Sequence, residues 1–167
     1  HLACGELDLG IGYRPEGKSG IVFEPLYDEE MRLVVAEGHP LAERKRVRMV
    51  ELHNQPLVLL RRTFATRLLL DECFASVGAE PNVIVETTSN VTSLAVARTL
   101  NVGTIAADHP ALSTPGLRVV ALESPTPSRT FGLLWKRDAA KSIAIQAFAA
   151  VVRGASQDAL RQSAVRL

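Results

Sequence analysis

Short runs of β-forming residues alternate along this chain with segments that have the spacing of amphipathic helices. The clearest helical segment covers residues 66–77, where apolar and small side chains recur every three or four residues before Gly78. A strand pattern follows at 82–87, and a second helix is predicted at 91–100 after Ser89 or Asn90 as its cap. Strands and helices that take turns along a chain predict an α/β domain.

The remaining elements are predicted from shorter apolar runs bounded by glycine and proline. Residues 50–52 are expected to form one helical turn and residues 143–152 a final amphipathic helix. Gly12 is expected to open a loop, the acidic segment 28–30 to form a solvated turn, and the proline-rich segment 124–128 to link two parts of the chain. Further strands are predicted at 7–11, 21–27, 31–36, 57–60, 103–107, 117–122 and 131–135.

Composition excludes several classes of protein. The 167 residues include 19 Lys and Arg against 18 Asp and Glu, so the chain lacks the basic excess with which a nucleic-acid-binding module grips phosphates. An apolar content of 47% with a net charge of +1 excludes a disordered chain. No apolar run approaches the roughly 18 residues of a membrane span, so no membrane contact is expected.

Residues that carry catalytic or metal chemistry are not grouped in this sequence. Cys4 and Cys73 are far apart and are expected to be buried free thiols of a reducing compartment. The four histidines are scattered: His1, His39, His53 and His109. Neither a nucleophile elbow nor a phosphate-binding loop is present. The sequence therefore predicts no enzyme, no metal and no cofactor.

One segment, residues 63–67, could hold a ligand. It lies between a buried strand and the strongest helix, and the first amides of a helix, together with its positive dipole end, favour a small anion. Thr63 or Thr66 can cap the helix, the Arg67 charge lies within reach, and Phe64 adds an apolar wall. An ordinary helix cap with polar surface residues has the same spacing, so the pattern leaves both interpretations open.

Several runs in a shared order resemble the effector-binding domain of LysR-type transcriptional regulators. They are GELDLGI at 5–11, LVVAEGHPLA at 33–42, the strand at 57–60, TFATR at 63–67, VIVE at 83–86 and GTI at 103–105. The similarity covers roughly residues 2–155. The run FATR at 64–67 with Asp71 looks most like the branch that contains the cyanate-responsive regulator.

The resemblance implies a two-lobed α/β domain of the type II periplasmic-binding-protein kind, with crossover strands at 31–36 and 131–135. Residues 36–128 would form the second lobe, and residues 1–35 with 129–167 the first. The family's winged helix-turn-helix and the opening strand and helix of its first lobe would precede residue 1. The chain is therefore expected to be N-terminally truncated, with an incomplete first lobe that exposes an apolar face.

A small-molecule inducer, expected to be a small anion or carboxylate, would bind between the lobes. In the family the residues at Thr63, Phe64, Ala65 and Thr66 line that cleft, and those at Gly12 and Tyr13 face it from the first lobe. The resemblance also implies a cytoplasmic regulator, dimeric or tetrameric, that reaches DNA only through the absent N-terminal domain. The alternatives are a solute-binding protein of a transport system, which would need an export signal, and an enzyme on the same fold, which would need an acid and base pair that we do not find.

Overall fold

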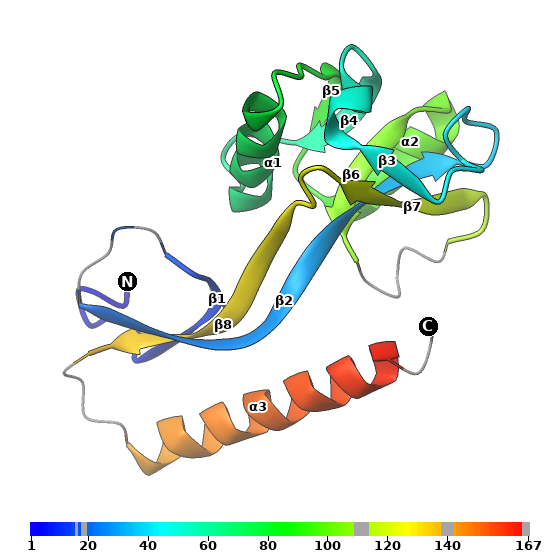
Figure 1. Ribbon diagram of the computed structural model, residues 1–167. Helices are drawn as coiled ribbons and strands as arrows, with labels where there is room; N and C mark the ends of the chain where they lie inside the picture. The colour runs from blue at the N-terminus through cyan, green and yellow to red at the C-terminus, as the bar shows by residue number, and fades with distance from the viewer. Residues whose placement is uncertain (16, 18–19, 109–113, 138–141, 165–167) are drawn as a thin grey trace. The chain divides into compact units, whose positions relative to one another are not determined.

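The computed structural model describes residues 1–15, 17, 20–108, 114–137 and 142–164, with side chains described as far as residue 158. The chain divides into two compact units (Figure 1). Unit 1 combines His1–Glu29 with Arg129–Leu167, and unit 2 is Glu30–Ser128. Unit 2 begins at Glu30, and the strand residues from Met31 onward pair with other strands of unit 2.

A mixed sheet forms the centre of unit 2. The second half of β2 (Ile21–Ala36) lies between β6 (Gly103–Ala107) and β7 (Leu117–Glu123) and is antiparallel to both. Beyond β6 follow β4 (Pro56–Leu60) and β5 (Asn82–Thr87), each parallel to its neighbour. Two β-α-β crossovers generate this parallel part, as the alternating sequence pattern predicts.

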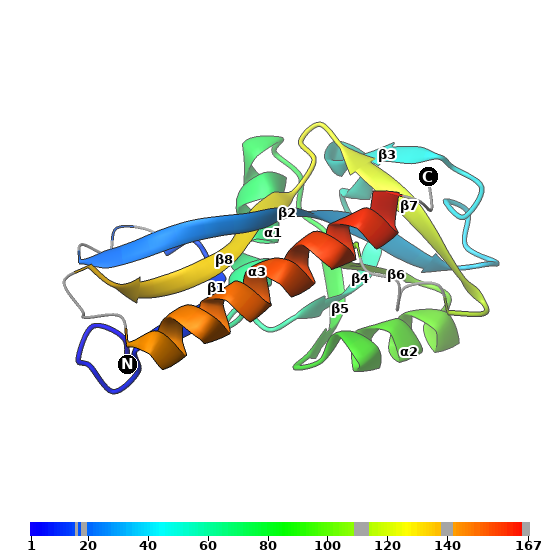
Figure 2. The ribbon, with the colours of Figure 1, turned by 90° about the horizontal axis from the view of Figure 1, so that it is seen from below.

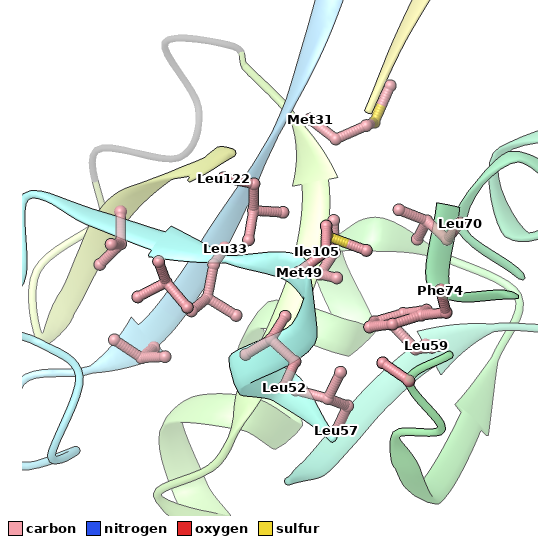
Figure 3. Packing of buried hydrophobic residues seen from close by; sticks show 14 of the residues in the cluster. Met31, Leu33, Met49, Leu52, Leu57, Leu59, Leu70, Phe74, Ile105 and Leu122 are labelled. Carbon is pink, nitrogen blue, oxygen red and sulfur yellow. The ribbon is translucent and has the colours of Figure 1, made fainter. Parts of the chain in front are cut away.

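Successive side chains of the central strands enter different hydrophobic clusters. Leu33, Leu57 and Ile105 belong to the main cluster, which also contains side chains of α1 (Ala65–Ser76) and of the 3₁₀ turn η1 (Met49–Leu52) (Figure 3). Their neighbours Val58 and Ala106 belong to two smaller clusters. The helix α2 (Asn90–Leu100) contributes to both of these. Since strand side chains alternate in direction, the two faces of the sheet are covered by different helices.

Unit 1 is smaller. Its β1 (Leu9–Tyr13) is antiparallel to β8 (Ser128–Lys136), which neighbours the first half of β2. The helix α3 (Ile143–Ala164) runs alongside these strands (Figures 1 and 2) and places Ala149 against Leu133 and Trp135. Among the described residues, no helix is long and apolar enough to cross a membrane.

The prediction of separate strands at 21–27 and 31–36 is wrong, because β2 is one strand of 16 residues. The acidic segment between them is not a solvated turn. Asp28 accepts a hydrogen bond from the Thr130 hydroxyl at 2.7 Å, and Glu29 forms an ion pair with Arg129. These partners on β8 stabilise the extended conformation of residues that the sequence alone places in a turn.

The first strand, the final helix and one short strand also differ from the predictions. The first strand is Leu9–Tyr13, so Gly12 lies inside it rather than in a loop, paired with Gly132. The final helix extends to Ala164, because residues 153–164 are mostly good helix formers even without an apolar stripe. The short strand β3 (Arg46–Arg48) was not predicted; it pairs with β7.

Candidate functional site

The first part of the candidate site is the segment that joins β4 to α1. The Arg61 amide donates to the Thr87 carbonyl at 3.0 Å, and the Phe64 amide donates to the Arg61 carbonyl at 3.0 Å. The helix starts at Ala65 with Phe64 as its extended N-cap. The prediction that Thr63 or Thr66 caps this helix is wrong in one respect, since the residue at the N-cap position is Phe64.

Thr63, Phe64, Ala65 and Thr66 are brought together at this helix start because they are consecutive in the chain. The first three are exposed, and Phe64 retains 37% of its accessible surface. Thr66 is buried. A ligand at this helix start would therefore meet an apolar ring, a hydroxyl from Thr63 and the positive end of the helix dipole.

The sequence suggested that the Arg67 charge lies within reach of an anion at this helix start, but in the structure protein groups surround the Arg67 side chain. Only 4% of its side chain is exposed, and its Nε donates to Asp71 at 2.8 Å. Its Nη1 donates to Glu86 at 2.7 Å and to the Leu60 carbonyl at 3.0 Å. Burial alone would lower the pKa of the guanidinium, but the hydrogen bonds and charges of Asp71 and Glu86 outweigh it and raise that pKa. Arg67 thus connects β4, α1 and β5 beneath the candidate site.

The start of α2 lies at the same edge of the sheet, since β4 and β5 are parallel and each is followed by a helix. Ser89 is the N-cap residue, as predicted, although its side chain makes no capping hydrogen bond. The buried Thr87 and Ser93 hydroxyls are 2.6 Å apart, and Ser93 donates to the Ser89 carbonyl. Polar groups at this second helix start were not predicted as site residues. They could have been found from the sequence, because Ser89 and Ser93 follow the strand predicted at 82–87, and ligands of open α/β sheets bind at the carboxyl ends of the strands.

Gly12 and Tyr13 are neighbours on β1 in unit 1, where Tyr13 pairs with Phe131 of β8. The Tyr13 hydroxyl donates to Glu29 at 3.3 Å, and the Arg129 guanidinium carbon lies 3.5 Å from the centre of the Tyr13 ring. Burial raises the pKa of the Tyr13 phenol to about 12; the Arg129 charge opposes this rise and Glu29 reinforces it. Tyr13 is therefore a neutral hydrogen-bonding aromatic group at physiological pH.

The cysteine prediction holds only in part. Both cysteines are free, but Cys4 is exposed and Cys73 is half-buried. Burial, with a smaller contribution from the Glu72 charge, raises the pKa of the Cys73 thiol, so this thiol is a poor nucleophile at neutral pH.

Within the described part of the chain, no three His, Cys, Asp or Glu side chains are grouped as metal ligands. His109 lies outside the described residues.

Unit 1 has a cavity of about 460 Å³ between β8 and α3, and its lining is Trp135, Ile145, Gln146, Ala149 and Arg153. Exposed large apolar side chains in the same unit are Leu7, Ile11, Ile143, Phe148 and Val151.

The sequence and the fold are similar to those of known proteins. The model of the LysR substrate binding domain family matches residues 1–157. The Bacillus subtilis (strain 168) protein named "Uncharacterized HTH-type transcriptional regulator YybE" is 27% identical over 135 residues, which are 80% of this chain and 46% of that protein. The chain thus spans about half the length of the curated relatives that it matches.

Two solved structures confirm the predicted α/β fold of the type II periplasmic-binding-protein kind. The effector binding domain of QuiR in complex with shikimate has a TM-score of 0.83 at 22% identity, covering 94% of this chain and 75% of that one. The regulatory domain of CcmR from Synechocystis PCC6803 in complex with 2-PG has a TM-score of 0.82 at 18% identity, covering 93% and 76%. At these identities the likeness shows the fold.

The curated relatives are named transcriptional regulators. This agrees with the prediction that the chain is not an enzyme and does not favour the alternative of a transport protein. With the family model matched over almost the whole sequence, the chain belongs to the family of LysR substrate-binding domains.

Proposed function

We propose that this chain is the inducer-sensing domain of a LysR-type DNA-binding transcriptional regulator. The observation that carries the proposal is the family match over residues 1–157, combined with an exposed loop and helix start directly after the buried strand β4. The inducer, a small anion or carboxylate, binds to Thr63, Phe64, Ala65 and Thr66 and, on the first lobe, to Gly12 and Tyr13. Tyr13 offers an aromatic edge, and the α1 start offers a positive dipole end.

In this proposal unit 1 corresponds to the first lobe and unit 2 to the second. An inducer held between them favours one relative arrangement of the lobes. It can do so only by its difference in affinity for the two arrangements, typically about 1–3 kcal/mol. The change is transmitted to DNA through a winged helix-turn-helix outside this sequence, in a cytoplasmic dimer or tetramer.

The run FATR at 64–67 with Asp71 supports the cyanate-responsive branch as the finer assignment. Cyanate is therefore one probe for the inducer, and shikimate and benzoate represent carboxylates with a six-membered ring. The three probes separate a small inorganic anion from a carboxylate.

A thermal-shift screen against these probes tests the proposal. A ligand that binds only the native state raises the melting temperature as its concentration increases. At 100 times its Kd, the ligand adds about 2.7 kcal/mol to the free energy of unfolding. Thr66→Val removes the hydroxyl while retaining volume, and Thr66→Ala removes both hydroxyl and methyl. We expect either variant to abolish the shift. The control is Thr99→Val on α2, whose hydroxyl donates to the Ala95 carbonyl at 2.9 Å within its own helix.

An unchanged shift in Thr66→Ala would contradict the placement of the inducer at the α1 start. A cooperative transition without any shift, across all three probes, would contradict the proposed ligand class.

A further inference from the structure

Tyr13 is held on two sides by charged residues from the other two strands of its unit. Arg129 of β8 lies over the ring, with its guanidinium carbon 3.5 Å from the ring centre. Glu29 of β2 accepts the hydrogen bond of the phenol hydroxyl at 3.3 Å. Phe131 meets the ring at 5.4 Å in an edge-to-face arrangement. One ring face and the hydroxyl of Tyr13 are thus already occupied by protein groups.

Arg129 and Glu29 also bind each other. Arg129 Nε lies 3.2 Å from Glu29 Oε2, and their side chains are 14% and 18% exposed. A planar guanidinium that stacks on an aromatic ring while pairing with a carboxylate holds a more restricted geometry than an exposed ion pair does. Removing one partner of a mostly buried ion pair leaves the other charge unpaired, which is destabilising. Arg129 and Glu29 therefore keep each other in place.

The position of this pair in the chain is the second observation. Glu29 is the last residue of the first segment of unit 1, and Arg129 is the first residue of its second segment. The ion pair therefore joins β2 and β8 at the two residues where these strands pass from unit 1 to unit 2. On the next residue pair, Thr130 donates to Asp28 at 2.7 Å and strengthens the same junction.

We propose that Arg129 and Glu29 are positioning residues for Tyr13, and that their ion pair links the conformation of Tyr13 to the two strands that connect the units. This inference rests on the proposed function in one respect: Tyr13 is there a contact for the inducer. A ligand that displaces or reorients Tyr13 changes the Arg129–Glu29 pair, and with it the residues at both crossings. Through the Arg129–Glu29 ion pair, a ligand that contacts Tyr13 can affect β2 and β8 without contacting these two strands itself.

The first part of the test needs no ligand. The sequence has two tyrosines, so ¹³C-labelled tyrosine rings give two sets of NMR signals, and Tyr27→Phe identifies those of Tyr13. We expect Glu29→Gln to shift the Tyr13 ring signals, to lower the pKa of its phenol and to shift the backbone amide signals of Glu30 and Arg129. Arg129→Lys retains the charge but loses the planar stack, and we expect it to shift the same ring signals.

The control is Glu24→Gln, which weakens the Arg153–Glu24 ion pair of 2.5 Å between α3 and β2 in the same unit. This variant has the same carboxylate-to-amide change on the same strand, at a residue that pairs with Arg153 of α3. We expect it to leave the Tyr13 signals and the Glu30 amide signal unchanged. If Glu29→Gln likewise leaves them unchanged, Glu29 does not position Tyr13 and the inference is wrong.

The second part measures the Kd of shikimate, benzoate and cyanate by calorimetric titration at a temperature where every variant is folded. We expect Glu29→Gln and Arg129→Lys to weaken binding by about fivefold or more, the lower end of typical coupling between sites, while Glu24→Gln binds as the parent does. If Glu29→Gln and Arg129→Lys bind the probes with the same Kd as the parent while their Tyr13 signals are shifted, the ion pair has no effect on ligand binding and this part of the inference is wrong. If the parent chain binds none of the probes, the proposed function fails for these ligands, whereas the NMR part still decides whether the pair positions Tyr13 and the crossings.

Discussion

Arg67 is a charged residue whose burial depends on several partners at once. Its guanidinium is 4% exposed, whereas its partners Asp71 and Glu86 are 32% and 45% exposed. In Arg67→Met both carboxylates lose their partner, but they can rehydrate. We therefore expect a loss of about 1–3 kcal/mol in the free energy of unfolding, below the 3–5 kcal/mol typical when a fully buried pair is broken. Urea unfolding followed by circular dichroism measures it.

The control for this prediction is Arg118→Met. Arg118 pairs with Glu37 at 2.8 Å in the same unit, but its side chain is 54% exposed. Exposed pairs contribute at most about 1 kcal/mol, so we expect a change within about 0.5 kcal/mol. Equal losses in the two variants would show that burial of Arg67 adds nothing to stability.

His39 predicts a pH dependence of stability. Its Nδ1 accepts a hydrogen bond from the Leu41 amide at 3.1 Å, and burial lowers the pKa of the imidazole from 6.5. Below pH 6.5 the unfolded chain binds a proton at this residue more readily than the folded chain does, so unfolding becomes easier as the pH falls. The stabilising contribution is complete above pH 6.5 and decreases down to the lowered pKa of the folded state.

Urea unfolding of the parent chain and of His39→Gln at several pH values between 5 and 7.5 checks this sign. Carboxylates contribute equally in both proteins, so the difference between the two curves isolates His39. We expect the parent to lose more stability than His39→Gln does as the pH falls below 6.5. A difference that does not vary with pH would contradict the lowered pKa.

At the residue scale, the grouping of Thr63, Phe64, Ala65 and Thr66 was predictable because it depends only on adjacency in the sequence. The burial of Arg67 was not predictable, because Glu86 is distant in the sequence and approaches only when β5 pairs with β4. The surroundings of Tyr13 were unpredictable for the same reason, since its partners Glu29 and Arg129 come from two other strands.

At the scale of elements, the pairing of β8 with β2 depends on one glycine. A methyl group on Gly132 would overlap the Glu24 carbonyl oxygen and lie 2.7 Å from the Phe23 ring. Backbone cannot move aside as a flexible side chain can. We expect Gly132→Ala to destabilise the chain by about 1–3 kcal/mol or more, measured as a lower midpoint in urea.

Gly154→Ala is the matched substitution inside α3. Apart from the adjacent residues and the backbone of α3 itself, no described atom lies within 4 Å of the added methyl group, and alanine is a better helix former than glycine. We expect a gain of about 0.5–1 kcal/mol in the same measurement. A stable Gly132→Ala variant would mean that β8 and β2 are less closely apposed than the structure shows.

Elements with a complete local pattern were predicted well. The strands Asn82–Thr87 and Gly103–Ala107 have the predicted bounds, and α1 differs by one residue at each end. The errors concern elements that depend on partners. The length of β2 depends on pairing across the acidic segment, and β3 consists of three residues that alternate too briefly to be seen in the sequence.

At the scale of the whole molecule, the two units have cores of different size. The main cluster of unit 2 draws on five strands, η1 and α1, whereas the core of unit 1 centres on Leu133, Trp135 and Ala149. A smaller core supplies less stabilisation against local unfolding. We therefore expect unit 1 to unfold at lower urea concentration than unit 2.

The single tryptophan makes this prediction measurable. Trp135 is 6% exposed in unit 1, so its fluorescence reports on that unit, whereas far-ultraviolet circular dichroism reports on both. We expect the fluorescence midpoint to precede the main circular dichroism transition, and Leu59→Ala in unit 2 to reduce the interval between them. Coincident transitions in the parent chain would instead indicate one cooperative unit.

The sequence by itself determined the α/β class, most of the strands and helices of unit 2, and the helix start that carries the candidate site. These features depend on periodicity, propensity and adjacency, which are local properties of a chain. Only the tertiary structure decided that β2 runs unbroken through the acidic segment, that Arg67 is enclosed by two carboxylates, and that Tyr13 is held by Glu29 and Arg129. Each of those depends on strand pairing between residues far apart in the sequence, and such pairing leaves no local pattern from which a buried charge or a stacked ring could be predicted.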